Sequence, residues 1–131
     1  MGIKTKDEYI ESLRKMNPVA SMFGERITNV VDNPRLRAGI EATGATHEIA
    51  EKDEYRDMVV TESPLINEKV NRFTLPPSSV EDLVARVKVN RNLGSYVGTC
   101  HQRCTGLDCL CTLSIVCYDI DKKYGTHYHD N

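Results

Sequence analysis

The chain has 131 residues, of which 40% are hydrophobic and 27% are charged, and its formal net charge is −2. This length suits one modest domain and is too short for a large multidomain enzyme. Seventeen Lys and Arg residues against nineteen Asp and Glu leave no excess of positive charge, so we expect no nucleic-acid partner. No apolar run approaches the roughly 20 residues of a membrane helix, and the first residues lack the apolar core of a signal peptide. We therefore expect a cytoplasmic protein that makes no membrane contact.

The first predicted element is a helix that begins after Thr5. Thr5 and Glu8 have the spacing of a capping box, in which each side chain accepts a hydrogen bond from the other residue's backbone amide. Pro18 disfavours helical geometry in the residue before it and ends this helix. Apolar residues at helical spacing predict a buried stripe: Tyr9, Ile10, Leu13 and Met16. A short hairpin around Gly24 is expected to follow.

A second helix is predicted from Asn33 and Pro34 to about Glu51, because Asn is a good cap and Pro is tolerated in the first turn. One face of it carries four residues at helical spacing: Leu36, Ile40, Thr43 and His47. We interpret His47 as a partly buried, hydrogen-bonded histidine, with a catalytic or ligand role as the alternative. Residues 61–77 contain three prolines and no sustained period, so we expect a long connecting loop there.

Two further helices are predicted in the second half of the chain. A capping box over residues 78–81 begins the first of them. Its expected buried stripe consists of valines and one leucine: Val80, Leu83, Val84 and Val87. Arg86, Lys88 and Arg91 lie away from that stripe, as a solvated basic face or as contacts to an anionic ligand or partner subunit. After a break at Gly94 and Gly98, residues 99–123 show helical periodicity again, and Tyr124 and Gly125 end it.

All five cysteines lie between Cys100 and Cys117, which is not the distribution of a secreted disulfide framework. If residues 99–123 form a continuous helix, Cys100 and Cys104 project from one side and Cys109 from the other. Side chains four residues apart on a helix have Cβ atoms about 5 to 6 Å apart, whereas a disulfide requires about 3.8 Å. The pair suits two thiolate ligands of one metal centre, and the neighbouring His101 and Arg103 would help to hold negative charge there.

Two alternatives to a shared metal centre remain open from the residues alone. The cysteines could instead be small buried side chains at a helix interface. An internal zinc site would need Cys111, His127 or His129, whose spacing from Cys100 and Cys104 matches no usual zinc finger. No dinucleotide fingerprint, P-loop, nucleophile elbow or zinc-protease motif occurs, so the chain contains no self-sufficient active site.

Three motifs resemble those of a family of flavin enzymes that includes the 4-hydroxyphenylacetate 3-monooxygenases: Y-x-x-S-L at 9–13, G-E-x-[IV] at 24–27 and S-x-x-D-L at 79–83. The monooxygenases carry a Gly-Arg-Thr-Pro-Asp-like segment where this chain has the C-x-x-x-C of Cys100 and Cys104. Residues 7–37, 66–94 and 98–129 therefore resemble the N-terminal part of the 4-hydroxybutyryl-CoA dehydratase family, also called vinylacetyl-CoA isomerases. The resemblance covers essentially the whole chain.

The resemblance implies a homotetrameric lyase and isomerase with an acyl-CoA-dehydrogenase-like fold, in which a helical N-terminal domain precedes a β-barrel and a second helical domain. Such enzymes use FAD and a [4Fe-4S] cluster to convert 4-hydroxybutyryl-CoA to crotonyl-CoA and to isomerise vinylacetyl-CoA. By resemblance, Cys100 and Cys104 are two of the cluster ligands, and a His and a further Cys lie downstream. In the family's proposed mechanism the flavin takes an electron as the substrate is deprotonated, and the cluster acts as a Lewis acid. Cys109, Cys111 and Cys117 match no family ligand and are expected to be structural.

We accordingly expect a mainly α chain, with residues 1–131 forming a single helical domain of about four helices, long loops and a short hairpin. Because the chain would supply half of a cluster site and no complete flavin site, we expect it to be inactive alone. It would then be a truncated product, a split subunit with a downstream partner, or an N-terminal domain. The alternatives are the N-terminal domain of a flavin-dependent monooxygenase and a non-catalytic helical docking module.

Overall fold

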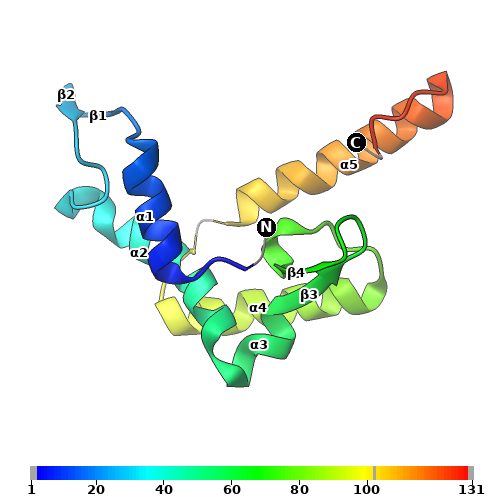
Figure 1. The fold of residues 1–131 in the computed structure, drawn as a ribbon, viewed down its shortest axis with the longest axis horizontal. Coiled ribbons are helices and arrows are strands. Elements are labelled where there is room, and N and C mark those ends of the chain that lie inside the picture. Colours follow the sequence, from blue (N-terminus) through cyan, green and yellow to red (C-terminus); the bar gives the residue numbers. More distant parts are fainter. Residues whose placement is uncertain (1–2, 102, 130–131) are drawn as a thin grey trace.

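The computed structural model describes residues 3–101 and 103–129, and it is mainly helical, which confirms the predicted fold class. Figure 1 shows the elements in chain order, which are α1 (Lys6–Met16), β1 (Ala20–Met22), β2 (Glu25–Ile27), α2 (Pro34–Glu51), α3 (Asp53–Val59), β3 (Val60–Ser63), β4 (Glu68–Asn71), the 3-10 turn η1 (Arg72–Thr74), α4 (Val80–Val97) and α5 (Cys104–Tyr124). The short helix α3 was not predicted. Within the described residues, no helix is long and apolar enough to cross a membrane.

The predicted starts of α1 and α2 are confirmed. Thr5 Oγ1 accepts a hydrogen bond from the Glu8 amide at 3.1 Å, and the Glu8 carboxylate accepts one from the Thr5 amide at 2.9 Å. The Asn33 side chain accepts from the Arg35 amide at 2.9 Å and so caps α2. These bonds satisfy amides that the first turn of a helix leaves without a partner.

The start of α4 lies one residue later than the capping box that the sequence suggested. Ser79, and not Ser78, is the cap, because its hydroxyl accepts from the Asp82 amide at 3.1 Å. Asp82, and not Glu81, is the acidic partner, and its carboxylate accepts from the Ser78 amide at 3.2 Å and from the Ser78 hydroxyl at 2.9 Å. Asp82 also pairs with Arg72 at 2.8 Å, which fixes η1 to the first turn of α4.

Both sheets are two-stranded hairpins. The predicted hairpin at Gly24 is confirmed: β1 and β2 pair antiparallel around Phe23 and Gly24, which both have positive φ. The loop predicted over 61–77 is wrong, because β3 and β4 pair antiparallel there, with Val60 opposite Asn71. The strands have four residues each and carry several charged or polar side chains, so no alternating apolar pattern marked them.

The helix α1 lies against α2, and ion pairs join the two helices. The stripe predicted for α1 is only partly covered, and Met16 is 68% exposed. Lys6 Nζ lies 2.9 Å from a carboxylate oxygen of Glu41 and 2.9 Å from one of Glu48, and these two acids raise the pKa of Lys6 well above its ordinary value. An ion pair shared between the two helices therefore accompanies an apolar stripe that is only partly buried.

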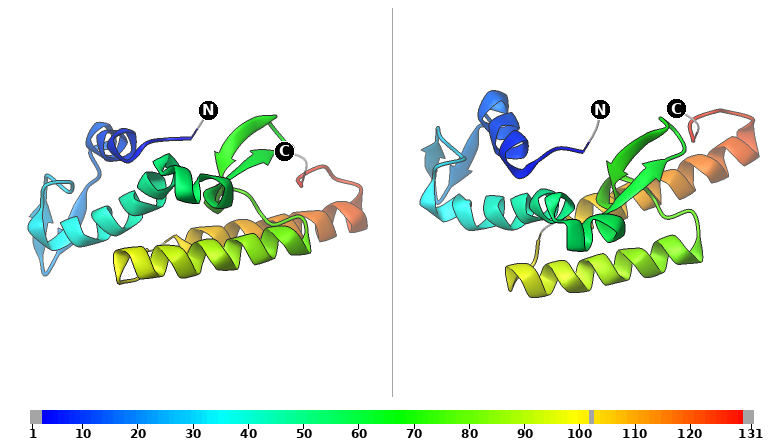
Figure 2. Two further views of the ribbon diagram at one scale, coloured as in Figure 1. Left: turned by 90° about the horizontal axis from the view of Figure 1, so that it is seen from below. Right: turned by 60° about the horizontal axis from the view of Figure 1, so that its bottom comes forward.

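The core lies where the second half of α2 meets α3, η1, α4 and the first turns of α5. Its members are Ala45, Ile49, Ala50, Val59, Phe73, Val89, Leu93 and Leu107. The apolar stripe predicted for α4 is wrong, because its four residues are exposed and the helix buries Val89 and Leu93 instead. In both views of Figure 2, α4 lies below α3 and the β3–β4 hairpin.

The helix α5 runs on from this core, and its last turns extend beyond the rest of the molecule (Figures 1 and 2). It begins at Cys104 and not at residue 99, and it ends at Gly125 in the left-handed conformation, as predicted. Leu107 is its one buried residue in the described part of the chain. Leu113 and Ile115 are both exposed and lie about 200° apart around the helix axis, so apolar side chains face opposite sides of α5.

His47 is buried in α2 and hydrogen-bonded, as predicted. Its Nδ1 lies 3.3 Å from the carbonyl oxygen of Lys4, and its ring stacks on Tyr9 with 4.9 Å between the centroids. A carbonyl oxygen only accepts, so Nδ1 carries the proton and Nε2 is left as an acceptor. Burial, reinforced by the charge of Arg103, lowers the pKa of His47 and keeps the ring neutral.

The first prediction concerns Leu107, which is 1% exposed, and Leu113, which is 60% exposed on the same helix. We expect Leu107→Ala to lower the free energy of unfolding by about 2 to 5 kcal/mol, because it leaves a cavity where α5 joins the core. Leu113→Ala is the matched control and should change it by less than about 0.5 kcal/mol. Urea denaturation followed by circular dichroism measures both, and equal losses would contradict the position of α5.

The second prediction concerns the pH dependence of stability. Because the folded chain favours neutral His47, the unfolded chain binds more protons below the ordinary histidine pKa of about 6.5. The free energy of unfolding should therefore fall as the pH is lowered from about 7.5 to about 5.5, and the slope should be smaller in His47→Gln. Urea midpoints at several pH values test this, since the other histidines are present in both proteins. Parallel pH profiles would be evidence against the buried neutral ring.

Candidate functional site

The two cysteines of the C-x-x-x-C segment do not share a helix face. Cys104 is the first residue of α5, and Cys100 lies in the connection that precedes it, so the predicted geometry is wrong at this point. Both side chains are exposed to solvent and both remain thiols. Between them, His101 is buried and Arg103 is largely covered by neighbouring elements. The segment therefore presents two thiols outward and two nitrogen-bearing side chains inward.

His101 packs under the segment. It is 4% exposed, and its ring is tilted against Phe73 with 5.1 Å between the centroids. Nε2 lies 3.8 Å from Cys104 Sγ, whereas Nδ1 is buried with no hydrogen-bond partner among the described residues. Burial, together with the charge of Arg103, lowers the pKa of His101. A neutral imidazole thus lies directly beside one of the two thiols.

Arg103 binds the segment to α2. Its Nη1 donates to Thr46 Oγ1 at 3.0 Å and lies 3.1 Å from His47 Nε2, which accepts because Nδ1 carries the proton. The guanidinium also lies over the Phe73 ring, 5.6 Å from its centroid. Sequence reasoning noticed the positive charge of Arg103 but missed these partners, because Thr46 and His47 lie more than 50 positions earlier in the chain.

The donor set fits part of a metal centre and not a whole one. Two soft thiols from one short segment suit two positions of a thiolate-bound zinc or iron-sulfur centre. Within residues 3–101 and 103–129, no group of three or more His, Cys, Asp and Glu side chains converges as metal ligands. The described residues therefore fit at most half of a four-ligand site.

The internal zinc site left open by the sequence is not formed by the described residues. His129 Nε2 lies 3.2 Å from Ser114 Oγ, and Ser114 is ten residues along α5 from Cys104, about 15 Å at the rise of an α-helix. Cys111 turns toward Arg86, whose Nη1 lies 3.4 Å from its sulfur. The carboxylate of Asp121 accepts from the backbone of Tyr128 and His129 and so holds the last described residues against α5.

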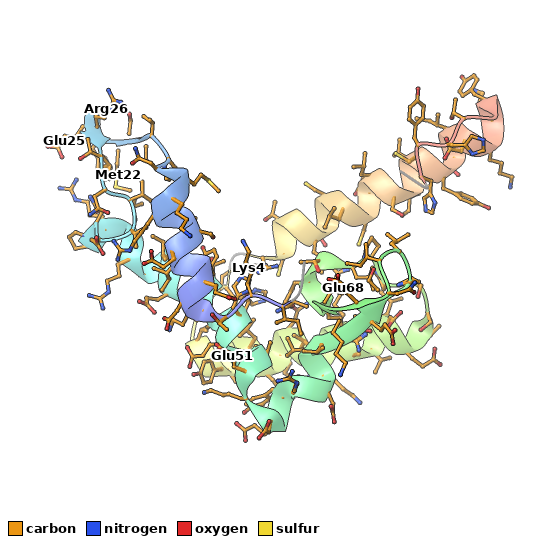
Figure 3. All side chains as sticks on the ribbon, in the orientation of Figure 1. Lys4, Met22, Glu25, Arg26, Glu51 and Glu68 are labelled. Carbon is orange, nitrogen blue, oxygen red and sulfur yellow. The ribbon has the colours of Figure 1, made fainter. Side chains whose placement is uncertain are left out.

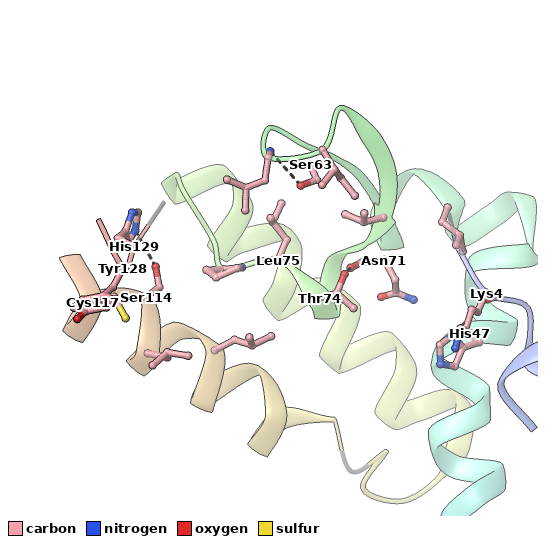
Figure 4. A pocket seen from close by; sticks show the side chains of 17 residues that line it. Lys4, His47, Ser63, Asn71, Thr74, Leu75, Ser114, Cys117, Tyr128 and His129 are labelled. Atoms are coloured by element: carbon pink, nitrogen blue, oxygen red, sulfur yellow. Dashed lines mark hydrogen bonds between the residues drawn. The ribbon is translucent and has the colours of Figure 1, made fainter. Parts of the chain in front are cut away.

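A groove of about 660 Å³ runs along one face of α5 (Figure 4). It is lined by the first residues of the chain, the β3–β4 hairpin, η1 and one face of α5, with His47 at one end and His129 at the other. Lys4, which accepts from His47, lies between α1 and the hairpin (Figure 3). Most of the surface that lines the groove is apolar, and its large apolar residues are Ile3, Leu65, Ile66, Val70, Leu75, Leu110 and Leu113.

Comparison with known proteins gives concordant results. The sequence profile described as "4-hydroxyphenylacetate 3-hydroxylase N terminal" matches residues 5–131. The chain is 43% identical over 129 residues to 4-hydroxybutyryl-CoA dehydratase/vinylacetyl-CoA-Δ-isomerase of Clostridium aminobutyricum, covering 98% of this chain and 26% of that protein.

A comparison of folds with solved structures finds the same type of enzyme. The oxygen-tolerant archaeal 4-hydroxybutyryl-CoA dehydratase of N. maritimus superposes with a TM-score of 0.89 at 40% identity, over 97% of this chain and 25% of that one. The chain thus spans about a quarter of the length of these two relatives. Because the profile match extends over nearly all of its residues, the chain belongs to the 4-hydroxyphenylacetate 3-hydroxylase N-terminal family.

Proposed function

We propose that this chain is the N-terminal part of a flavin- and [4Fe-4S]-dependent dehydratase that converts 4-hydroxybutyryl-CoA to crotonyl-CoA and isomerises vinylacetyl-CoA. The observation that carries the proposal is the pair of exposed thiols, Cys100 and Cys104, held by one segment of a fold that matches a 4-hydroxybutyryl-CoA dehydratase at a TM-score of 0.89. The alternative function, a flavin-dependent monooxygenase, gives no role to two exposed thiols at these positions. In this proposal the protein acts in the cytoplasm.

The exposed apolar helices support a role as part of a larger assembly. A helix that is apolar on all sides is normally buried, yet most of α5 is exposed in this chain. Valines on the outer face of α4 are exposed in the same way. We propose that these faces are covered by the remaining three quarters of a dehydratase-type protein, in the same or a separate chain, within a homotetramer. Residues 1–131 form its helical N-terminal domain in this proposal.

The residues of this chain would hold one side of the cluster. Cys100 and Cys104 would be two thiolate ligands, while a His and a Cys from the downstream part would complete the set. When bound, the cluster supplies a Lewis acid for the leaving hydroxyl group and FAD supplies one-electron chemistry. His101 packs beneath Cys104 and would exclude water from that side of the thiolate. With half of the ligands and no complete flavin site, the chain alone should be inactive.

The third prediction tests the ligand assignment. The chain is mixed anaerobically with a separately produced downstream three quarters of the Clostridium dehydratase, and iron and sulfide are supplied. We expect iron binding and the broad visible absorption of a cluster in the mixture, and no stable cluster in the chain alone. Cys100→Ala or Cys104→Ala should abolish both signals, because each removes a ligand.

The matched control is Cys109→Ala, since Cys109 is an exposed thiol of α5, the helix that begins at Cys104. It should retain the iron content of the unmodified chain. Equal iron in all three variants would show that these thiols are not ligands. Crotonyl-CoA formation, measured in the same mixtures, should follow the iron content.

A further inference from the structure

We propose that Arg103 is the positioning residue of the thiol site: its guanidinium, fixed by Thr46 and His47, locks the Cys100–Cys104 segment onto α2 and supplies the positive charge that an anionic thiolate centre requires. The inference rests on the proposed function, because it takes Cys100 and Cys104 as ligands. It concerns Arg103, which is not itself a ligand.

The electrostatic surroundings of Arg103 are unlike those of the other covered arginines. Arg72 pairs with Asp82 at 2.8 Å and Arg86 pairs with Asp108 at 2.9 Å. Arg103 forms no salt bridge with any Asp or Glu in the described part of the chain, and its interactions there are with Thr46, His47 and aromatic rings. A covered cation without an anion is costly, and the described residues supply no carboxylate that pairs with this positive charge.

The position of Arg103 identifies where a counter-charge would belong. It directly precedes Cys104 in the sequence and lies three positions after Cys100, and both thiols are exposed on the outer side of the segment. Two metal-bound thiolates would bring negative charge to the residues on either side of Arg103 in this segment, whereas Arg72 and Arg86 have their aspartates in direct contact.

The contacts of Arg103 also explain how the segment is held in one place. Lys4 O accepts from His47 Nδ1, which leaves His47 Nε2 to accept from Arg103. Thr46 Oγ1 donates to Thr43 O at 2.7 Å and accepts from the same guanidinium nitrogen. Each partner is therefore oriented by a second bond within or beside α2. Groups that orient ligands in this way typically change metal affinity about 10- to 100-fold when they are removed.

The fourth prediction uses the 131-residue chain and Co²⁺ as the probe. Anaerobic titration is followed by the near-ultraviolet thiolate-to-cobalt charge-transfer band. We expect Arg103→Met to weaken Co²⁺ binding about 10- to 100-fold. Arg103→Lys keeps the charge but cannot form the same planar contacts, so it should restore part of the affinity. Arg86→Met, which removes a comparably covered guanidinium that has its own aspartate, should bind as the unmodified chain does.

A second readout does not depend on metal. In ¹⁵N NMR spectra, His47 should show a protonated Nδ1 and a hydrogen-bonded Nε2 in the unmodified chain. Arg103→Met should shift the Nε2 signal toward that of a free imidazole nitrogen, with partial recovery in Arg103→Lys. An unshifted Nε2 signal in Arg103→Met would overturn the proposed clamp.

The outcomes separate this inference from the proposed function. If Cys100→Ala and Cys104→Ala lose the cobalt band while Arg103→Met binds normally, the ligands stand and the role of Arg103 is overturned. If the two cysteine variants keep the band, both proposals fail. Should circular dichroism show that Arg103→Met is unfolded, Thr46→Val decides, because it keeps the volume and the charge of the segment. It is expected to weaken binding several-fold, and an unchanged affinity would overturn the inference.

Discussion

One turn of α2 connects most of the molecule. The carbonyl oxygen of Thr46 accepts from the buried Asn71 side chain at the end of β4, and its hydroxyl accepts from Arg103. The next residue, His47, holds the start of the chain through Lys4 and also contacts Arg103. Three segments that are distant in the sequence are thereby joined at two adjacent residues. Buried polar networks of this kind favour one arrangement, because any other arrangement leaves a donor or acceptor without a partner in a dry interior.

Local signals in the sequence predicted the features that depend on neighbouring residues. The cap at Thr5, the Asn33 and Pro34 start of α2, the turn at Gly24 and the stop at Gly125 each depend on backbone bonds within a few positions, so they could be predicted. The C-x-x-x-C segment was likewise singled out from residue types alone. Its role as two cluster ligands came from the family resemblance, and it remains a prediction.

Contacts between distant residues determine what the sequence did not reveal. The periodicity of residues 99–123 continued the last helix back over Cys100, whereas the structure turns His101 and Arg103 inward against Phe73 and α2 and delays the helix to Cys104. The prediction of a buried apolar stripe on α4 was wrong for a related reason. Its valines satisfy the helical period, but the neighbours present in this chain bury Val89 and Leu93. Periodicity identifies an apolar face without identifying which partner covers it.

The outward direction of the two thiols has a consequence for biogenesis. In small zinc domains the metal is part of the core, so the apoprotein is unfolded. Here the core, which α2, α3, η1, α4 and the start of α5 form together, contains neither Cys100 nor Cys104, and the inner side of their segment is already bonded to protein. In the proposed function, folding and metal loading would therefore be separate events. Metal delivery would act on a finished surface, and a maturation defect would leave a folded, empty intermediate that is still able to meet its partner.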